Sequence, residues 1–251
     1  MSRPLLSLVG VTKRFGGVAA VSDVSFDVDK GQVLGLIGPN GAGKTTLLNC
    51  ISGVHHLDAG KIFLDGVQVS GKRAFRIARL GIGRTFQVVK PFPSMTVRQN
   101  TALGAMFGRE GHLGQSARAM EQADEVLSAV GLASRADKPV TSLTIPERKK
   151  LEVARALAMQ PTVLLLDEVM AGLNSTEVDE ALDVVRAVNA GGVTIVLIEH
   201  VMRVVVGVCQ RAVVLHQGKV LAEGETGQVL EDSRVIEAYL GERYARTHQQ
   251  G

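Results

Sequence analysis

A glycine-rich run between two apolar segments carries the side chains with the clearest chemistry in this sequence. Residues 38–46 read GPNGAGKTT and fit the pattern G-x-x-x-x-G-K-[ST] in full. The apolar run 33–37 predicts a buried strand before the loop, and residues 46–51 predict the start of a helix after it. A glycine-rich turn can match this pattern by chance, but the strand–loop–helix context favours a phosphate site. Backbone N–H groups and the helix N-terminus would then form a cradle for a nucleoside triphosphate.

The expected roles differ along this loop. Lys44 is expected to reach the β- and γ-phosphates, and the Thr45 hydroxyl is expected to ligate Mg²⁺. The residues expected to contact the nucleotide are Gly38, Pro39, Asn40, Gly41, Ala42, Gly43, Lys44, Thr45 and Thr46.

A second apolar strand ends in two carboxylates. Residues 163–166 read VLLL, and Asp167 and Glu168 follow them. An aspartate at the carboxyl end of such a strand can hold Mg²⁺ directly or through water, so we expect Asp167 to lie opposite Thr45. Glu168 is expected to orient or deprotonate the attacking water. Strands often end in acidic residues, so this pair gains its meaning from the lysine-bearing loop. Together the two motifs predict triphosphate hydrolysis around one metal ion.

Composition limits the other classes of function. The chain has 251 residues, 45% hydrophobic and 21% charged, which is enough for one large domain or one domain with an inserted subdomain. Aromatic residues make up only 4% and Trp is absent, which argues against a base-stacking nucleic-acid surface. The net charge of +3 requires neither DNA nor an anionic membrane as a partner. Cys50 and Cys209 fit no metal spacing, and Cys50 is expected to be a buried thiol.

The hydrophobic pattern changes along the chain. No signal peptide is expected near the first residues, and no segment approaches the ~18 apolar residues of a membrane span. The pattern predicts antiparallel strands early, helices in the middle and buried strands late, with a hairpin near the end. The expected ranges are strands 5–11, 18–28, 61–69, 82–87, 162–167 and 193–198, helices 72–80, 97–107, 117–130, 146–159 and 177–188, and hairpin 211–216 with 220–223. The order predicts an α/β core with an antiparallel β layer and a helical insertion.

Further residues match functional positions of one family, and the chain resembles the ATP-binding subunit of ABC transporters over almost its whole length. The resemblance implies a single ABC ATPase domain of the α/β class. Its RecA-like P-loop core and antiparallel β subdomain would comprise residues 1–87 and 159–251, and its helical subdomain would span about 88–158.

The resemblance also implies roles for single residues. Phe15 would stack on adenine; the alternative is a core phenylalanine at a strand end. Gln87 would sense Mg²⁺ and water and connect to the membrane subunit, and His200 would contact the γ-phosphate. Residues 171–174 would form the D-loop, which crosses the dimer interface in the family.

One motif departs from the family pattern. The family's L-S-G-G-Q segment binds the γ-phosphate held by the other protomer, and the corresponding residues here are Leu143, Thr144, Ile145, Pro146 and Glu147. Thr144 and Glu147 predict a capping box, and a proline is tolerated in the first helical turn. The anion site is weakened, because proline lacks an N–H, isoleucine replaces a glycine and glutamate adds a negative charge.

Two interpretations of this segment remain open. Either the composite site that it completes hydrolyses ATP slowly, which we favour, or Arg148 and Lys149 replace the lost positive field. The L-S-G-G-Q segment is called the signature, and residues 143–147 are this chain's signature segment. Because a partner's signature would complete this chain's own phosphate loop, a heterodimer with one strong and one weak site follows. A homodimer is the alternative.

Four stretches are similar to the ATP-binding subunits of branched-chain amino acid uptake systems, namely residues 14–21, 83–87, 167–174 and 236–241. The resemblance implies an importer on the cytoplasmic face of the inner membrane, with two permease subunits, a second ATPase subunit and an extracytoplasmic substrate-binding protein. ATP and Mg²⁺ would be its cofactors. Residues 90–93, with Phe92 as a candidate anchor, are expected against a permease helix; the alternative places Phe92 inside the helical insertion. The other functions considered are a lipid or lipopolysaccharide exporter, a non-transport ABC ATPase and a non-hydrolysing regulator.

Overall fold

The chain folds into two compact units in a computed structural model that describes residues 3–86, 91–111 and 114–239. One unit comprises Met1–Lys72 and Val196–Gly251, and the other comprises Arg73–Ile195. Strand β8 (Thr194–Ile198) is buried throughout and contains the boundary between them. The sequence boundaries expected for the helical subdomain stay a prediction.

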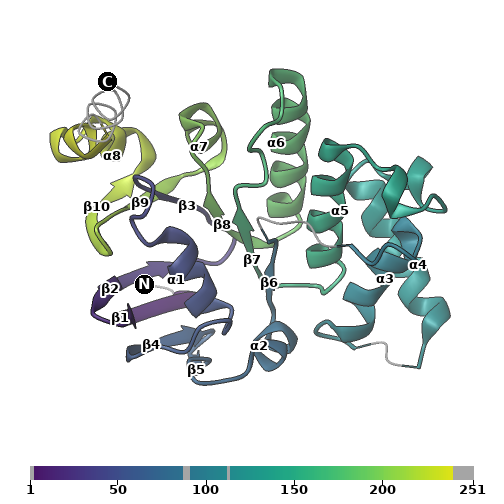
Figure 1. The fold of residues 1–251 in the computed structure, drawn as a ribbon, viewed down its shortest axis with the longest axis horizontal. Coiled ribbons are helices and arrows are strands. Elements are labelled where there is room, and N and C mark those ends of the chain that lie inside the picture. Colours follow the sequence, from purple (N-terminus) through teal and green to yellow (C-terminus); the bar gives the residue numbers. More distant parts are fainter. Residues whose placement is uncertain (1–2, 87–90, 112–113, 240–251) are drawn as a thin grey trace. The chain divides into compact units, whose positions relative to one another are not determined.

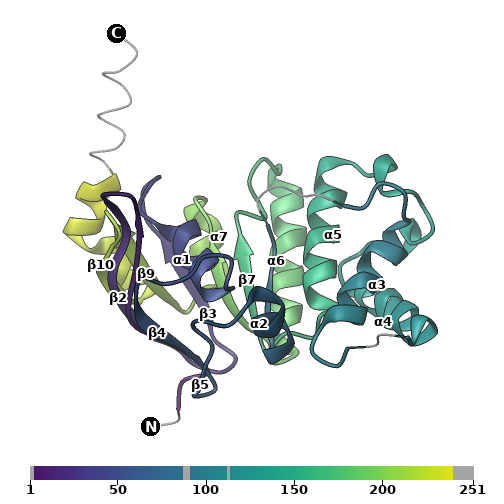
Figure 2. The same cartoon turned by 60° about the horizontal axis from the view of Figure 1, so that its bottom comes forward.

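An antiparallel sheet forms the N-terminal part of the first unit. Its strand order is β2-β1-β4-β5, with β1 Leu6–Phe15, β2 Val18–Val28, β4 Ala59–Leu64 and β5 Val67–Gln68. Figure 2 shows β2 and β4 of this sheet together with α1, and α1 contacts β1 and β2. The expected stretch 61–69 turns at Asp65 and Gly66, whose dipeptide is a turn signal in the sequence, and both residues take positive φ (45° and 66°). Two successive positive φ values define the tight turn that suits antiparallel strands.

Parallel and antiparallel pairing meet at β9 in the same unit. The completely buried β3 (Val33–Ile37) pairs in parallel with β9 (Arg211–His216), and β9 pairs antiparallel with β10 (Lys219–Glu225). The β9–β10 turn again has two positive φ values, at Gln217 and Gly218. Both the buried strand after residue 32 and the late hairpin are therefore confirmed.

Short helices complete this unit. They are α1 Lys44–Ile51, α7 Met202–Val208 and α8 Thr226–Glu231, and residues 233–239 add a further helical segment. Helix α1 buries Leu47, Leu48 and Ile51 completely. Cys50 on the same helix is buried as expected, and burial raises its pKa to about 11, so its thiol is not a nucleophile at neutral pH.

The second unit begins with a helix and two parallel strands. Helix α2 (Ala74–Leu80) leads into β6 (Ile82–Arg84), and β6 pairs in parallel with the buried β7 (Val163–Asp167). The amphipathic α6 (Ser175–Ala190) follows β7 and buries Val178, Leu182 and Val185 on one face, as its periodicity predicts. Figure 1 shows α2 and β6 in blue and β7 and α6 in green.

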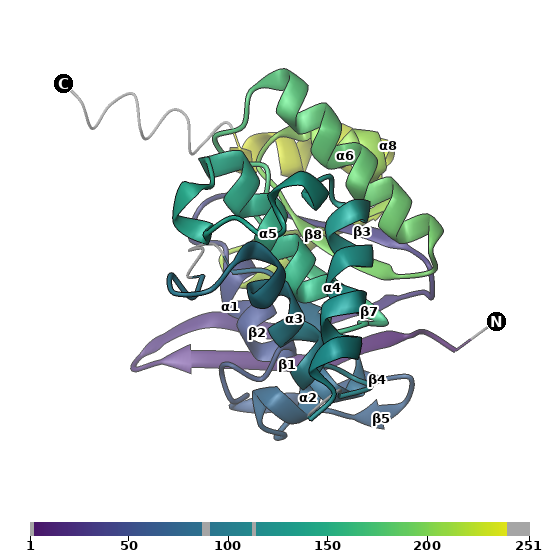
Figure 3. The ribbon, with the colours of Figure 1, turned by 90° about the vertical axis from the view of Figure 1, so that its right-hand side faces the viewer.

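The middle of the second unit is helical. It contains α3 Val97–Phe107, α4 Ser116–Ala129, α5 Ile145–Leu157 and the short helices η1 Ala133–Arg135 and η2 Val140–Ser142. Val97, Leu127 and Leu151 share one buried cluster, and alanines of α3 and α4 form a second. Figure 3 shows α3, α4 and α5 packed together. Among the helices of the described ranges, none has the length and apolar content that a bilayer crossing requires.

Helix α3 approaches α5 through a glycine. A Cβ on Gly104 would overlap the backbone oxygen of Arg155. Replacing a helix-interior glycine with alanine ordinarily stabilises a helix by about 1 kcal/mol. Here overpacking against α5 costs about 1–3 kcal/mol, so we expect Gly104→Ala to lower the free energy of unfolding by about 1 kcal/mol in urea denaturation.

The matched control is Gly227→Ala in α8. Gly227 is exposed and nothing lies within 4 Å of a Cβ at that position, so this change is expected to leave stability unchanged or to raise it. Stabilisation by Gly104→Ala would contradict the close approach of α3 and α5.

Candidate nucleotide-binding site

The phosphate loop joins β3 to α1 through backbone conformations that require glycine. Gly38, Gly41 and Gly43 have φ values of 143°, 75° and 102°. A Cβ on Gly38 would overlap the carbonyl oxygen of Leu215, and one on Gly43 would overlap that of Ala20. The loop is thus held against two neighbouring strands by contacts that admit no side chain. Gly43 is also the N-cap of α1, so the loop ends at a helix N-terminus as the motif predicts.

Lys44 bends back over the loop from the first position of α1. Its side chain is 5% exposed, and Nζ donates to the carbonyl oxygens of Gly38 (2.7 Å) and Pro39 (2.8 Å). These bonds place the ammonium group at the loop's own backbone, where a bound polyphosphate would meet it. Thr45 and Thr46 follow in the first helical turn and are half-buried.

Phe15 ends β1 with an accessible ring. It is 47% exposed, and its ring meets His55 edge-on at a centroid distance of 5.2 Å. Lys13 Nζ lies 5.4 Å from the same ring. The exposure excludes the alternative of a core phenylalanine and leaves ring surface for a planar base. Nothing in the sequence singled out His55 as a neighbour of this ring.

The structure describes one of the two remaining predicted residues, His200, but not the other, Gln87. His200 is the second residue after β8 and is exposed, whereas Glu199 between the strand and His200 is 1% exposed. Gln87 lies outside the described residues, so its expected contacts stay a prediction.

The first carboxylate of the acidic pair is buried in an ion pair. Asp167, at the end of β7, accepts from Arg84 Nη2 at 3.0 Å, and the two side chains are 0% and 5% exposed. The backbone N–H of Asp167 donates to Thr85 Oγ1 at 3.1 Å. Burial lowers the pKa of Arg84, while the charge of Asp167 opposes that shift. The end of β6 therefore fixes Asp167 through both its side chain and its backbone.

The roles of Arg84 and Thr85 beside Asp167 were not predicted from the sequence. Arg84 pairs with Leu165 in the β6–β7 register, which brings its guanidinium to the end of β7. The sequence placed Arg84 in a short strand, but it did not show that this strand pairs with β7.

Glu168 has an unusual backbone for a non-glycine residue. Its φ is 53°, in the left-handed region, and its side chain is half-buried. Such conformations cost about 1–3 kcal/mol and concentrate at functional sites. Because of this left-handed conformation, the backbone at Glu168 does not continue the extended direction of β7.

The signature segment caps a helix as predicted. Thr144 Oγ1 accepts from the N–H of Glu147, and the Glu147 carboxylate accepts from the N–H of Thr144 at 2.8 Å. That backbone bond lowers the pKa of Glu147, with help from Arg135, whose Nε donates to it at 2.7 Å. The negative charge is thus directed back onto its own segment. Ile145 beside it is 69% exposed.

Two cations next to this segment contact nearby carbonyl groups. Arg148 Nε donates to the oxygen of Leu143 at 3.1 Å, and Lys149 Nζ donates to the oxygen of Ala171. The expected D-loop, residues 171–174, therefore begins at Ala171, which accepts a hydrogen bond from Lys149 of α5. It ends at Asn174, whose side chain caps α6 in a second capping box with Glu177.

Family models match the two regions that carry these features. Residues 21–171 match the model described as ABC transporter, and residues 219–245 match the branched-chain amino acid ATP-binding cassette transporter model. The chain belongs to the ABC transporter family. It is an ATP-hydrolysing cassette of that family, as the loop and the acidic pair predict.

Relatives of the cassette span nearly its whole length. The high-affinity branched-chain amino acid transport ATP-binding protein BraF of Pseudomonas aeruginosa is 39% identical, covering 96% of this chain and 100% of the relative. The corresponding LivG protein of Escherichia coli is 37% identical with the same coverage.

Solved structures agree with the fold. A nucleotide-free cassette from an ABC transporter superimposes with a TM-score of 0.84 at 30% identity, covering 94% of this chain and 99% of that one. Another ABC cassette in its ADP conformation gives 0.85 at 30% identity, covering 96% and 100%. The predicted α/β cassette fold is confirmed.

The donor atoms suit a magnesium–triphosphate. Within the described ranges no group of three or more His, Cys, Asp or Glu side chains could hold a metal ion unaided. Mg²⁺ in nucleotide sites takes one or two protein oxygens and fills its remaining positions with phosphate and water. The Thr45 hydroxyl and the Asp167 carboxylate fit that requirement. The loop and the acidic pair lie in different compact units, and their meeting around one ion stays a prediction.

The buried Arg84–Asp167 pair is testable by a double-mutant cycle. Arg84→Met leaves a buried carboxylate without its guanidinium, so we expect the free energy of unfolding to fall by about 3–5 kcal/mol. Arg84→Met combined with Asp167→Asn is expected to cost less than the sum of the single changes. Urea denaturation of the purified cassette measures each value.

The exposed pair between Arg186 and Asp183 on α6 is the control. Its side chains are 53% and 77% exposed, so Arg186→Met is expected to cost at most about 1 kcal/mol. Equal costs for Arg84→Met and Arg186→Met would show that the Asp167 pair is not a buried ion pair.

Proposed function

We propose that this cassette powers the import of branched-chain amino acids or closely related small solutes. The observation that carries the proposal is the match of residues 219–245 to the branched-chain amino acid cassette model. The names of the relatives BraF and LivG support the same solute class. These matches favour import over the exporter and non-transport alternatives.

The geometry within each unit supports the following proposed roles in ATP hydrolysis. Lys44 would stabilise negative charge on the β- and γ-phosphates from its position on the loop carbonyls. Thr45 and Asp167 would hold Mg²⁺, which neutralises developing charge during phosphoryl transfer. Glu168 would orient the attacking water, and Gln87 and His200 would complete the site on the γ-phosphate side. Phe15 would stack on adenine through its exposed face.

The proposed assembly follows from the family and from the signature segment. Two cassettes would enclose ATP head to tail, with a second and different ATPase subunit as partner. Two permease subunits would hold them at the cytoplasmic face of the inner membrane. An extracytoplasmic binding protein would deliver the solute and would contact this chain only indirectly.

An aromatic groove in the second unit suits a permease helix. It is a cavity of about 320 Å³, lined in part by Phe86, Phe92 and Phe107. These rings are 52%, 47% and 52% exposed. Half-exposed aromatic side chains around a cavity are typical anchors of protein interfaces. The occupant we propose is a short cytoplasmic helix of a permease subunit.

The groove residue Phe92 is held rigidly by its backbone. Its N–H donates to Asn100 Oδ1 at 2.8 Å, and Asn100 Nδ2 donates back to its carbonyl at 3.1 Å. Asn100 is fully buried. The Arg155 guanidinium lies 5.7 Å from the Phe92 ring and pairs with Glu152 at 2.6 Å. A backbone fixed before binding loses little entropy when a partner docks, so Phe92 is the favoured anchor.

We expect Phe92→Ser to weaken capture of the permease subunits at least tenfold, because a buried aromatic anchor contributes about 2 kcal/mol or more. Co-purification from detergent-solubilised membranes measures the capture. The control is Phe75→Ser on α2, an equally exposed ring (52%) that does not line the groove. Equal retention of permease by both variants would argue against this docking surface.

The two cations beside the signature favour a slow composite site. Arg148 and Lys149 both donate to carbonyl oxygens of their own chain. Reaching a partner's γ-phosphate would require breaking those bonds, so these cations are poorly placed to replace the missing glycine amides. The interpretation that the site completed by this segment hydrolyses slowly is therefore preferred.

Reconstitution of the complete transporter tests both the solute and the asymmetry. Proteoliposomes with the binding protein and internal MgATP are expected to take up radiolabelled leucine, with competition from isoleucine and valine. Glu168→Gln in this chain is expected to lower uptake and phosphate release at least a hundredfold, since it removes the group that activates water.

The equivalent change in the partner ATPase separates the two sites. It is expected to reduce phosphate release much less, because this chain's signature completes the partner's site. Equal losses from the two changes would rule out the asymmetric model. Efficient ATP hydrolysis without uptake of leucine, isoleucine or valine would contradict the proposed solute class.

A further inference from the structure

The first amide of the phosphate loop is bound by a residue at the far end of the chain. The N–H of Gly38 donates to the hydroxyl oxygen of Tyr239 at 2.7 Å. Tyr239 belongs to the segment 236–241, whose similarity to branched-chain amino acid cassettes had no assigned role. The roles proposed above for the loop and the acidic residues do not use it.

Gly38 links Tyr239 to the site lysine through a single residue. Its N–H points to the tyrosine hydroxyl, and its carbonyl oxygen accepts from Lys44 Nζ at 2.7 Å. Its Cα lies so close to Leu215 that no side chain fits there. The start of the loop is therefore fixed from three directions, by β9, by Lys44 and by Tyr239.

The helical segment that presents Tyr239 is docked independently of the loop. Val235 is 2% exposed, and its N–H donates to the oxygen of Asp232 at 2.9 Å. The Asp232 carboxylate also accepts from the N–H of Arg234 at 2.8 Å. These local bonds hold the segment in place without contributions from the nucleotide site.

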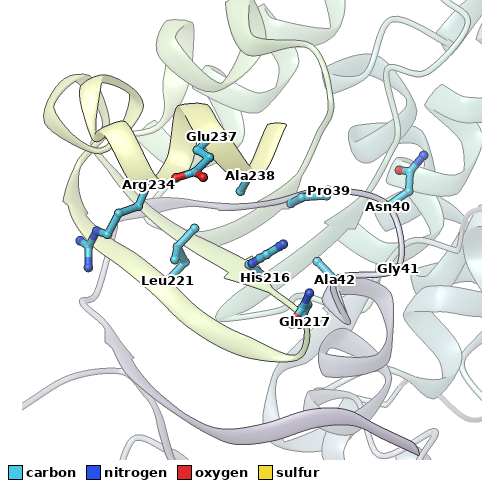
Figure 4. Close-up of a pocket in the computed structure, with 10 residues that line it drawn as sticks. All are labelled: Pro39, Asn40, Gly41, Ala42, His216, Gln217, Leu221, Arg234, Glu237 and Ala238. Carbon is cyan, nitrogen blue, oxygen red and sulfur yellow. The ribbon is translucent and has the colours of Figure 1, made fainter. Parts of the chain in front are cut away.

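A cavity separates the rest of this segment from the loop. It has a volume of about 660 Å³ and is lined by Pro39, Asn40, Gly41 and Ala42 on the loop and by Arg234, Glu237 and Ala238 on the segment. Figure 4 shows the two sets of residues facing each other across it. The lining mixes apolar side chains with polar ones such as Asn40, Gln217 and Glu237, so water can enter this space and find hydrogen-bond partners there. Pro39 and Ala238, the chain neighbours of Gly38 and Tyr239, line this space, so the bond between Gly38 and Tyr239 adjoins a space that water can enter.

We propose that Tyr239 is a positioning residue that preorganises the phosphate loop for nucleotide binding. The proposal rests on the proposed role of the Lys44 loop. Without the hydroxyl, a water molecule from the cavity can satisfy the Gly38 amide, so overall stability is maintained. That water is not tied to the docked segment, so the loop regains freedom that nucleotide binding must then remove.

Tyr239→Phe in the full chain removes the hydroxyl and keeps the ring. We expect the Kd for a fluorescent ATP analogue with Mg²⁺, and the KM for ATP, to rise about three- to tenfold, as expected for one lost net hydrogen bond. We expect kcat to change less than twofold and the urea unfolding midpoint to remain unchanged. This split separates positioning of the loop from a general loss of structure.

Ile236→Ala is the matched control on the same helical segment. Ile236 is 44% exposed, and its replacement is expected to leave Kd, KM and stability unchanged. Unchanged nucleotide affinity in Tyr239→Phe would overturn the proposal, as would a parallel loss of affinity and stability. Lys44→Ala is measured alongside. If it kept wild-type affinity, the proposed phosphate site would fail and the inference with it, whereas a failure of Tyr239→Phe alone would leave that site intact.

Discussion

The structure depends on the close approach of glycine backbone to neighbouring strands at the phosphate loop. Gly38 packs on Leu215 and Gly43 on Ala20 with no space for a Cβ. These contacts place the loop at the end of β3 and at the start of α1, where Lys44 folds back onto the Gly38 and Pro39 carbonyls. A side chain at either glycine would displace the loop from both strands, and the lysine would lose its carbonyl partners.

The acidic motif is positioned by a different kind of interaction. Asp167 is buried, and a buried carboxylate is stable only with a charged or hydrogen-bonding partner. The short strand β6 supplies both, through the guanidinium of Arg84 and the hydroxyl of Thr85. The left-handed turn at Glu168 then follows a residue that is held through both its side chain and its backbone. Rigid support directly before a strained residue keeps the proposed base in one orientation.

In the signature segment, the residues that stabilise the start of α5 are poorly suited to bind an anion. Pro146 and the Thr144–Glu147 capping box make a well-formed start to α5. Compared with the family's L-S-G-G-Q pattern, Pro146 lacks an N–H, Ile145 replaces a glycine and Glu147 adds a carboxylate. Arg135, Arg148 and Lys149 satisfy partners within the chain. The segment is therefore well built as structure and poorly suited to a γ-phosphate, which is the physical basis of the proposed asymmetry.

The sequence alone determined the elements and motifs that local chemistry encodes. Glycine spacing, apolar periodicity and the T-x-x-E cap predicted the loop, the helices α3 to α6 and the capping box, since each depends on residues a few positions apart. Only the tertiary structure decided the partners of Asp167 and Gly38, which are 83 and 201 residues away from them. No spacing rule links such distant residues, because strand pairing and the docking of the C-terminal segment bring them together. The same reason explains why Arg84, Thr85 and Tyr239 were not identified beforehand, although each was within a quoted motif.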